Sequence, residues 1–234
     1  MSQLNLAIVI PALNEESTLP QLMKELATLK PAEIIVINDF SQDRTARVAA
    51  ELGATVLNLA DPLGAWGATQ AGLRYACEKK FPLVVTMDAD GQHLPGEIAK
   101  LINYQAVSGA NIVVGSCVER GSPMRHWAWR ILRCMSDLSV RDLTSGFRLY
   151  DHHAQQVATD TRASLLDYQD IGLLLLATSR GLSISETPVE MLPRRQGASR
   201  VFRSWWFVAY YMAYSGLLAL SKRRPRTTNA RASS

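Results

Sequence analysis

The first half of the chain alternates between short apolar runs and longer segments whose apolar residues recur with helical spacing. The short runs are apolar throughout, which is typical of strands buried on both faces of a parallel sheet. Amphipathic segments between such strands are expected to cover the sheet as helices. The expected strands are residues 6–12, 33–39, 54–59, 82–88 and 110–116, and the expected helices are residues 15–29, 41–53, 65–80 and 95–107. This alternation predicts an α/β fold: a doubly wound, Rossmann-like, mostly parallel sheet with helices on both faces.

One predicted helix, residues 41–53, carries residues suited to its ends. Ser41 stands where a side-chain oxygen could accept from the first turn, and Gly53 follows the last helical residue. We therefore expect Ser41 to be the N-cap and Gly53 to close the helix.

Charge divides the chain more sharply than composition does. Its 234 residues, 47% hydrophobic and 20% charged, are enough for one folded domain with a sizeable core. All 21 acidic residues lie at or before Glu190, whereas nine of the 25 Lys and Arg residues lie from Arg194 onward. Such a tail indicates a polyanionic partner, namely a membrane surface, a phosphorylated ligand or a nucleic acid, unless it is simply solvated. We divide the chain into a globular domain, residues 1–200, and a tail, residues 201–234.

The cysteines and the N-terminal sequence bear on the cellular compartment. Cys77, Cys117 and Cys134 are scattered and show no CxxC or Cys/His spacing, which favours a reducing compartment over a disulfide framework or a zinc site. The stretch NLAIVIPALNEE has no basic region before its apolar run. We therefore expect no signal peptide and a cytoplasmic protein.

Polar side chains follow three of the predicted strands, at the edge where α/β sheets bind ligands. They are Asn14 and Glu15 after the first strand, Asn38 and Asp39 at the end of the second, and Asp88, Asp90 and Gln92 at the end of the fourth. Hard oxygen ligands at alternate positions suit Mg²⁺ or Mn²⁺, which would in turn hold a diphosphate. The alternative is that the aspartates only cap turns and the next helix.

Other families that use two aspartates or phosphate loops fit less well. A haloacid-dehalogenase-type phosphatase has DxDGT on its first strand, whereas here the aspartates follow the fourth strand and Gln92 stands in place of the Thr. No P-loop is present, and no GxGxxG follows the first strand, so NTPase and dinucleotide-binding functions are disfavoured.

Six segments in a fixed order resemble the inverting family 2 glycosyltransferases with the GT-A fold, and among them the dolichyl- or polyprenyl-phosphate sugar synthases. The segments are VIPALNEE, VINDFSQDRT, MDADGQH, IVVGS, DLTSGFR and RRQGASR, which cover roughly residues 6 to 200. Each segment alone is a modest signal, but the ordered set is specific. The resemblance implies a metal-dependent enzyme that transfers a sugar, with inversion, from a nucleotide sugar to a lipid-linked phosphate.

The resemblance also implies roles for residues on the donor side. Asp88 and Ala89 would lie beneath the ribose and the diphosphate. The carboxylate of Asp39 can accept a hydrogen bond from a base N–H or a ribose hydroxyl. The residues that would line the base and ribose pocket are Pro11, Leu13, Glu15, Ile37 and Asp39.

Around the diphosphate, Asp90 and Gln92 would be the ligands of Mg²⁺ or Mn²⁺. Arg194 and Arg200 match the family's basic pair, with Arg in place of Lys at residue 200. They would cover the leaving diphosphate, where the transition state develops negative charge. The alternative for this segment is a solvated basic loop.

The segment DLTSGFR is interpreted as an acceptor-side loop. Asp142 would orient or deprotonate the acceptor, and Ser145 and Arg148 would contact it or shape the loop. An acceptor phosphate is already a competent nucleophile, whereas a sugar hydroxyl would need Asp142 as a base. Gln169 and Asp170 match a helix start that supports the acceptor site. The alternative interpretation is that Asp142 and Asp170 each cap a turn or helix.

The sequence departs from the family pattern at two positions. Asn38 stands where the family has an aspartate, and Cys117 stands where it has an arginine that faces phosphate. Arg120 is our candidate to replace that arginine on the catalytic and acceptor side. His93 is interpreted as a structural part of its loop. These departures bear on the acceptor more than on the donor chemistry.

Residues 205–220 of the tail form a run of apolar or small residues rich in aromatics, between Arg203 and KRRPR. As a helix of 1.5 Å per residue the run would be about 24 Å long, short of a hydrocarbon core of about 30 Å. Aromatic residues with basic flanks favour a helix lying in the headgroup interface, so we expect residues 203–226 to contact the membrane surface. A full span through a thinned bilayer and a helix buried in a homo-oligomer are the alternatives.

Together these features predict a glycosyltransferase that is peripheral on the cytoplasmic face of a membrane. The expected donor is a GDP- or UDP-linked sugar, and the expected acceptor is a polyprenyl or dolichyl phosphate. One alternative is transfer to a glycan or glycolipid hydroxyl. Another is a catalytically silent nucleotide-sugar-binding membrane adaptor, which the departures at residues 38 and 117 suggest. No nucleic-acid partner is expected, since no reader motif accompanies the basic tail.

Overall fold

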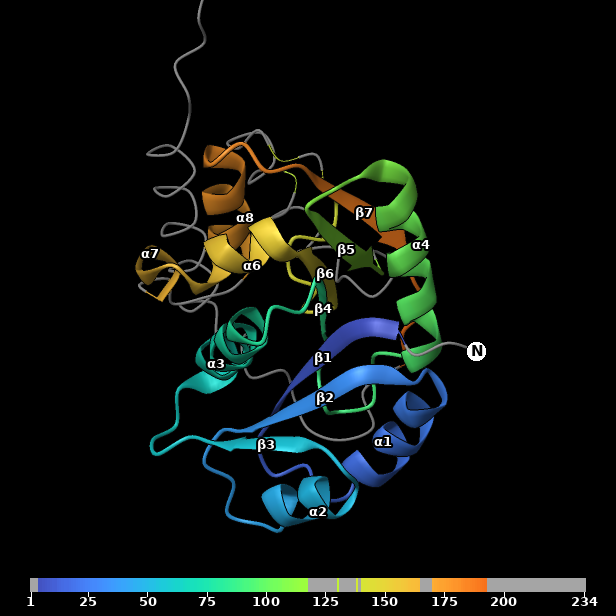
Figure 1. Cartoon of the computed structure of the whole chain (residues 1–234), viewed down its shortest axis with the longest axis vertical. Helices are drawn as coiled ribbons and strands as arrows, with labels where there is room; N and C mark the ends of the chain where they lie inside the picture. The colour runs from blue at the N-terminus through green and yellow to red at the C-terminus, as the bar shows by residue number, and fades with distance from the viewer. Residues whose placement is uncertain (1–3, 118–129, 131–137, 139, 165–169, 193–234) are drawn as a thin grey trace, which may run out of the picture.

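The protein was analysed as a computed structural model, which describes residues 4–117, 130, 138, 140–164 and 170–192. Its centre is a sheet of seven strands in the order β3-β2-β1-β4-β6-β5-β7 (Figure 1). Among the described strands, β6 alone runs antiparallel to its neighbours, β4 and β5. The strands are β1 (Leu4–Ala12), β2 (Pro31–Asn38), β3 (Thr55–Asn58), β4 (Leu83–Thr86), β5 (Ile112–Ser116), β6 (Arg148–Asp151) and β7 (Ile184–Pro188).

Helices cover both faces of this sheet. One face packs against α1 (Leu19–Thr28), α2 (Thr45–Glu51), the 3₁₀ turn η1 (Pro95–Glu97) and α4 (Ile98–Ser108). The other face packs against α3 (Gly64–Glu78), α6 (His152–Thr159), α7 (Thr161–Ser164) and α8 (Asp170–Ser179) (Figure 1). The predicted α/β fold with a mostly parallel, doubly covered sheet is confirmed.

Strand β1 shows why its sequence is apolar throughout. Ala7 and Val9 belong to the core beneath α3, whereas Leu6, Ile8 and Ile10 belong to the core beneath α1. Successive side chains of a strand point to opposite faces, so a central strand covered on both sides needs apolar residues at every position.

The close packing of α3 on the sheet depends on one glycine. A Cβ atom at Gly72 would lie 2.5 Å from Cγ1 of Val9 and 2.6 Å from Cδ1 of Ile37, so any larger residue would push the helix away. On its other side α3 donates from the indole nitrogen of Trp66 to the carbonyl of Ala163 at 3.0 Å. The helix is thus fixed between the sheet and the segment that follows α6.

The predicted strands and helices of the first half are all present, but the cap of the second helix is corrected. Helix α2 begins at Thr45, not at Ser41. The Ser41 hydroxyl instead accepts from the backbone N–H of Asn14 at 3.0 Å, so it joins two loops rather than capping a helix. Gly53 has a φ of 84° and donates its N–H to Ala50, as expected of a residue that closes a helix.

The short strands β6 and β7 have no counterpart in the sequence-based prediction. Strand β6 enters the sheet antiparallel between β4 and β5. Its first residue, Arg148, therefore lies at the edge where the parallel strands end. That reversal brings the loop in front of β6 to the same edge as the ends of β1, β2 and β4.

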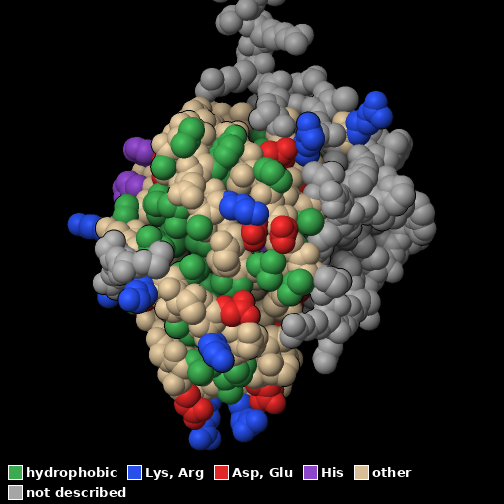
Figure 2. Space-filling model, turned by 90° about the vertical axis from the view of Figure 1, so that its right-hand side faces the viewer, with side chains coloured by type: hydrophobic (Ala, Val, Ile, Leu, Met, Phe, Trp, Pro, Cys, Tyr) green, Lys and Arg blue, Asp and Glu red, His purple; other side chains and the backbone are tan. Residues whose placement is uncertain are grey.

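Acidic and basic side chains are interspersed on the described part of the face that carries α4 and α1, and neither sign forms a continuous patch there (Figure 2). The basic excess of the sequence lies in residues 194–231, which are outside the described residues. The expected division at residue 200 and the apolar run of residues 205–220 lie outside them too. Among the described residues, no helix is long and apolar enough to cross a membrane.

Candidate active site

Backbone hydrogen bonds at the carboxyl ends of the strands gather the predicted site residues. The N–H of Asp39 donates to the carbonyl of Ala12 at 2.9 Å, and the N–H of Met87 donates to Val9 at 3.1 Å. The hydroxyl of Thr86 donates to the carbonyl of Gly146 at 2.7 Å. The ends of β1, β2 and β4 and the loop before β6 are therefore joined at one edge of the sheet.

The loops after β1 and β2 are bonded to each other through side chains. Asn14, at a φ of 57°, accepts from the N–H of Gln42 at 2.8 Å and donates its own N–H to Ser41. The N–H of Glu15 donates to the Thr45 hydroxyl at 2.8 Å. Pro11, Leu13 and Glu15 are part-exposed beside this junction.

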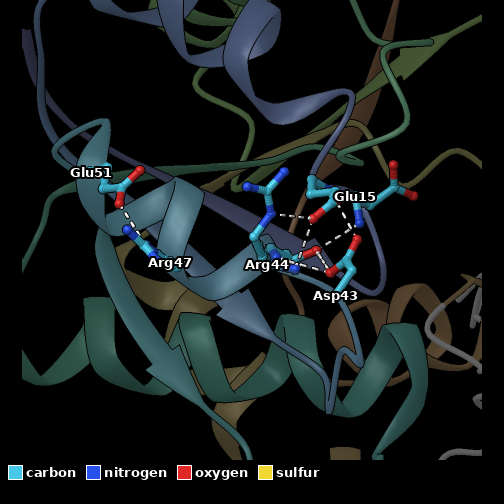
Figure 3. Close-up of polar contacts among 7 residues, drawn as sticks. Glu15, Asp43, Arg44, Arg47 and Glu51 are labelled. Carbon is cyan, nitrogen blue, oxygen red and sulfur yellow. Dashed lines mark hydrogen bonds and ion pairs between the residues drawn. The ribbon is translucent and has the colours of Figure 1, made fainter.

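Asp43 is the centre of that junction (Figure 3). Its carboxylate accepts from the N–H and the hydroxyl of Thr45 at the start of α2 and from the N–H of Glu16. Partial burial raises the pKa of Asp43, but these hydrogen bonds to the ionised form outweigh it and hold the pKa below the usual 3.8. Glu16 also accepts from the backbone and side chain of Arg44, which fastens the same two loops a second time.

Asp39 is buried, with 4% of its surface exposed, at the end of β2. Its Oδ1 accepts from the N–H of Leu63 at 2.7 Å, just before α3. The neighbouring Asn38 uses its amide on both sides: it donates to Oδ1 of Asn58 at 2.9 Å and accepts from the N–H of Ser41 at 3.2 Å. Asn38, which stands in place of the family's aspartate, thus connects β2 with β3 and with the loop that follows β2.

The segment after β4 makes a tight turn that leaves carboxylates at the sheet edge. Oδ1 of Asp90 accepts from the N–H of Gln92 at 3.1 Å, and Gly91 between them has a φ of 74°. The side chain of Asp88 is 43% exposed, whereas Ala89 is buried beneath the turn. Asp90 thus caps the turn through Oδ1, as the turn-capping alternative predicts, and its carboxylate charge remains at the sheet edge.

His93 anchors this turn from inside, as its interpretation as a structural residue predicts. It is buried, and its Nδ1 accepts from the N–H of Asp88 at 2.9 Å. Its ring stacks on Phe147 at 5.1 Å between centroids, with 17° between the planes. Phe147 in turn accepts from the N–H of Gly115 at 2.8 Å, so one imidazole connects the turn after β4 with the loop before β6 and the end of β5.

The chain that leaves β7 runs beside the same turn. The N–H of Leu192 donates to the carbonyl of Gln92 at 2.9 Å, and Met191 pairs with His93. Arg194 lies outside the described residues, two positions beyond Leu192.

The donor set after β4 would suit a divalent cation that takes only some of its ligands from the protein. Nowhere among the described residues do three or more His, Cys, Asp or Glu side chains form a group that could hold a metal ion. Asp88 and Asp90 nevertheless place two carboxylates on one short turn. Mg²⁺ is commonly held by one or two carboxylates together with substrate phosphates, so this sparse set fits an ion shared with a diphosphate.

Asp142 is buried and holds the acceptor-side loop together. Its Oδ1 accepts from the N–H of Thr144 at 3.1 Å and from the Thr144 hydroxyl at 3.3 Å, and its Oδ2 accepts from the N–H of Cys117 at 3.3 Å. Glu186 on β7 accepts from the N–H groups of Arg141 and Asp142 at 2.5 and 3.3 Å. These contacts match the turn-capping alternative and place residue 117 beside the loop through its backbone.

Arg148 is buried, and its contacts favour a role in shaping the loop over contact with the acceptor. Its Nε donates to the carbonyl of Ser145 at 2.7 Å, and a terminal nitrogen donates to the carbonyl of Leu143 at 3.1 Å. The Ser145 hydroxyl accepts from the N–H of Phe147 at 3.3 Å. Both side chains thus hold the backbone of the loop before β6.

The structure describes only part of the predicted site. Arg120, Gln169, Arg194 and Arg200 lie outside the described residues. Asp170 is the first described residue of α8, and the helix start predicted at Gln169 and Asp170 stays a prediction. The sequence did not predict two hydrogen bonds of the site. The N–H of Leu63 donates to Asp39, and the N–H of Asp142 in the acceptor-side loop donates to Glu186. These partners are 24 and 44 residues apart in the chain, and no local pattern signals them.

Comparisons with known proteins agree with this geometry. Residues 7–163 match Glycosyl transferase family 2. Polyprenol monophosphomannose synthase of Mycolicibacterium smegmatis is 28% identical over 83% of this chain and 80% of its own length. Undecaprenyl-phosphate mannosyltransferase of Micrococcus luteus is 30% identical over 82% of this chain and 86% of its own length. The crystal structure of glucosyl-3-phosphoglycerate synthase from Mycobacterium tuberculosis with Mn²⁺, uridine diphosphate and phosphoglyceric acid has a TM-score of 0.66 at 20% identity, covering 93% of this chain and 78% of that chain.

Proposed function

The chain belongs to glycosyl transferase family 2, and from that premise we propose that it transfers a sugar from a nucleotide sugar to a lipid-linked phosphate. The order of the strands carries the proposal. Along the sheet edge, the loops of β2 and β1 come first, the carboxylates after β4 next, and the loop before β6 last. That order suits a nucleoside, a diphosphate and an acceptor bound side by side.

We assign the binding of the donor to four segments, residues 11–15, 37–39, 88–92 and 194–200. Asp39, Leu13 and their neighbours would hold the nucleoside, and the turn of residues 88–92 would hold the diphosphate. A divalent cation bound by Asp90 and Gln92 would supply positive charge to the diphosphate as it leaves. The synthase from Mycobacterium tuberculosis, which shares the fold, was crystallised with Mn²⁺ and uridine diphosphate, and this supports the assignment.

The reaction exchanges one bond at the anomeric carbon. An oxygen of the acceptor phosphate would attack that carbon from the side opposite the diphosphate, forming the new C–O bond as the bond to the diphosphate breaks. The bond's electron pair leaves on the nucleoside diphosphate, where Arg194 and Arg200 would add positive charge. The configuration is therefore inverted. An ionised phosphate needs no proton removed before it attacks.

The contacts of Asp142 favour a phosphate over a hydroxyl acceptor. Both of its carboxylate oxygens already accept hydrogen bonds within the protein, and the residue is only 6% exposed. A carboxylate occupied in this way suits the orienting role better than that of a base, which a hydroxyl acceptor would require. The two mannosyl-transferring relatives, whose names include a polyprenol or undecaprenyl phosphate, support the same acceptor class.

Location at a membrane follows from such an acceptor, whose lipid tail is embedded in the bilayer. We assign the contact to residues 203–226, on the cytoplasmic face, because this segment combines aromatic residues with basic flanks. Anionic headgroups would attract its Lys and Arg side chains.

A donor screen tests the proposal directly. The full chain would be incubated with Mn²⁺ or Mg²⁺, polyprenyl phosphate and, in turn, GDP-mannose, UDP-glucose or UDP-N-acetylglucosamine. We expect one donor to give a glycosylated lipid phosphate and a nucleoside diphosphate in equal amounts. Binding of a nucleotide sugar without transfer to any lipid or glycan acceptor would instead support a silent adaptor.

A further inference from the structure

Phe40, the residue after the buried Asp39, has an unusual backbone conformation. Its φ is 63°, in the left-handed region that glycine and asparagine favour, and 46% of its surface is exposed. For a bulky side chain this conformation is an outlier, because in the left-handed region Cβ crowds the following carbonyl oxygen. A residue so placed and so exposed gains little from core packing, so its aromatic ring needs another explanation.

Hydrogen bonds place Phe40 opposite Leu13 at the sheet edge. Asp39 donates its N–H to Ala12, and Asn14 donates its N–H to Ser41. Residues 13 and 40 lie between these two bonds, one on each loop. The exposed ring thus belongs to the junction that we assign to the nucleoside.

Leu63 supplies a second exposed apolar side chain beside the same carboxylate. It is 57% exposed, and its N–H donates to Oδ1 of Asp39 at 2.7 Å. Oδ2 of Asp39 makes no hydrogen bond to a described residue. The end of β2 therefore carries a hydrogen-bond acceptor with two exposed apolar residues close by: Phe40, the next residue in the chain, and Leu63, whose backbone contacts the carboxylate.

A planar heterocycle with an N–H edge matches this arrangement. Its faces would pack against apolar or aromatic groups, and its N–H would donate to the carboxylate. Resting on the proposed function, we propose that Phe40 stacks on the nucleobase of the donor while Leu63 borders the base and Asp39 accepts from its edge. Phe40 is thus a binding residue, and its strained backbone presents the ring to the ligand.

The test compares glycine at two positions with matched backbones. Lys80 has a φ of 61° and is exposed at the end of α3, so Lys80→Gly makes the same backbone change away from the site. Calorimetry with Mn²⁺ would give the Kd of GDP and of UDP for the wild type, Phe40→Gly, Phe40→Tyr and Lys80→Gly. For the tighter nucleotide we expect Phe40→Gly to raise the Kd at least about fivefold, since base–aromatic stacking commonly contributes that much. Phe40→Tyr and Lys80→Gly should stay near the wild-type value.

Pyrophosphate, which has no base, separates stacking from a general disturbance of the site. We expect Phe40→Gly to bind pyrophosphate with Mn²⁺ as the wild type does, and its circular dichroism to match. Equal nucleotide affinity of Phe40→Gly and wild type, or equal losses for nucleotide and pyrophosphate, would overturn the stacking role and leave the proposed function standing. Failure of the wild type to bind either nucleotide would overturn the proposed function and the stacking role together.

Discussion

Asp90 holds its turn through a hydrogen bond, and we propose that the same side chain also binds the cation. Its Oδ1 accepts from the N–H of Gln92, and an asparagine could keep that bond through its amide oxygen. We therefore expect Asp90→Asn to retain the fold but to lose the carboxylate charge that would bind the cation. Turnover should fall by roughly a hundredfold or more, because charge at the diphosphate is lost where the transition state needs it.

Transfer rates at saturating Mn²⁺, with thermal unfolding of both proteins as the control for folding, measure this effect. Near-native turnover of Asp90→Asn, or wild-type turnover that a chelator leaves unchanged, would exclude the metal role.

At the residue scale, the sequence predicted the positions of the candidate site residues better than it predicted their hydrogen-bond partners. Asp39, Asp88 and Asp90 could be placed at one edge because each follows a predicted strand, and parallel strands end together. The burial of Asp142 and Arg148 could not be foreseen. Their contacts depend on β6 entering the sheet antiparallel, which four residues without a distinctive period do not signal.

At the scale of elements, the junction between the β1 and β2 loops depends on the charge of Asp43. The folded protein holds the pKa of Asp43 below its ordinary 3.8, so folding is stabilised by the ionised form. That contribution is present above about pH 4, and it is lost as the pH falls through the folded-state pKa.

We therefore expect Asp43→Asn to be less stable than the wild type at pH 7 and to lose less of its stability between pH 5 and pH 3. Thermal unfolding of both proteins across that range measures the difference. Melting curves that shift in parallel would show that Asp43 contributes nothing to acid sensitivity.

The alternating strands and helices of the first half were predicted well, whereas β6 and β7 of the second half were not. The helix over residues 41–53 was recognised, but it begins at Thr45. The Ser41 hydroxyl accepts from the N–H of Asn14 in the β1 loop and therefore does not cap the helix. Strands β6 and β7 are held by their neighbours in the sheet, and such context has no signature in a single sequence.

For the whole molecule, the uneven charge predicts how the protein meets a membrane. We expect deletion of residues 203–234 to move the protein from the membrane to the soluble fraction while nucleotide binding remains measurable. Replacing Lys222, Arg223, Arg224 and Arg226 by glutamine in the full chain should weaken sedimentation with anionic vesicles and reduce its salt dependence. Unchanged partitioning of the truncated chain would exclude this segment as the membrane contact.

The central claim is that the acceptor is a lipid phosphate, and Asp142 offers the most direct test. The measurement is the transfer rate of wild type and Asp142→Asn with polyprenyl phosphate and with the unphosphorylated polyprenol. We predict transfer to the phosphate alone, with Asp142→Asn keeping substantial activity and a shallow pH dependence, because an ionised phosphate needs no base. The asparagine can keep the two bonds from Thr144 through its amide oxygen and loses only the bond from the N–H of Cys117, and thermal unfolding of both proteins controls for that loss. Transfer to the alcohol but not the phosphate, with a loss on the order of a hundredfold or more in Asp142→Asn, would contradict the claim and identify a hydroxyl acceptor.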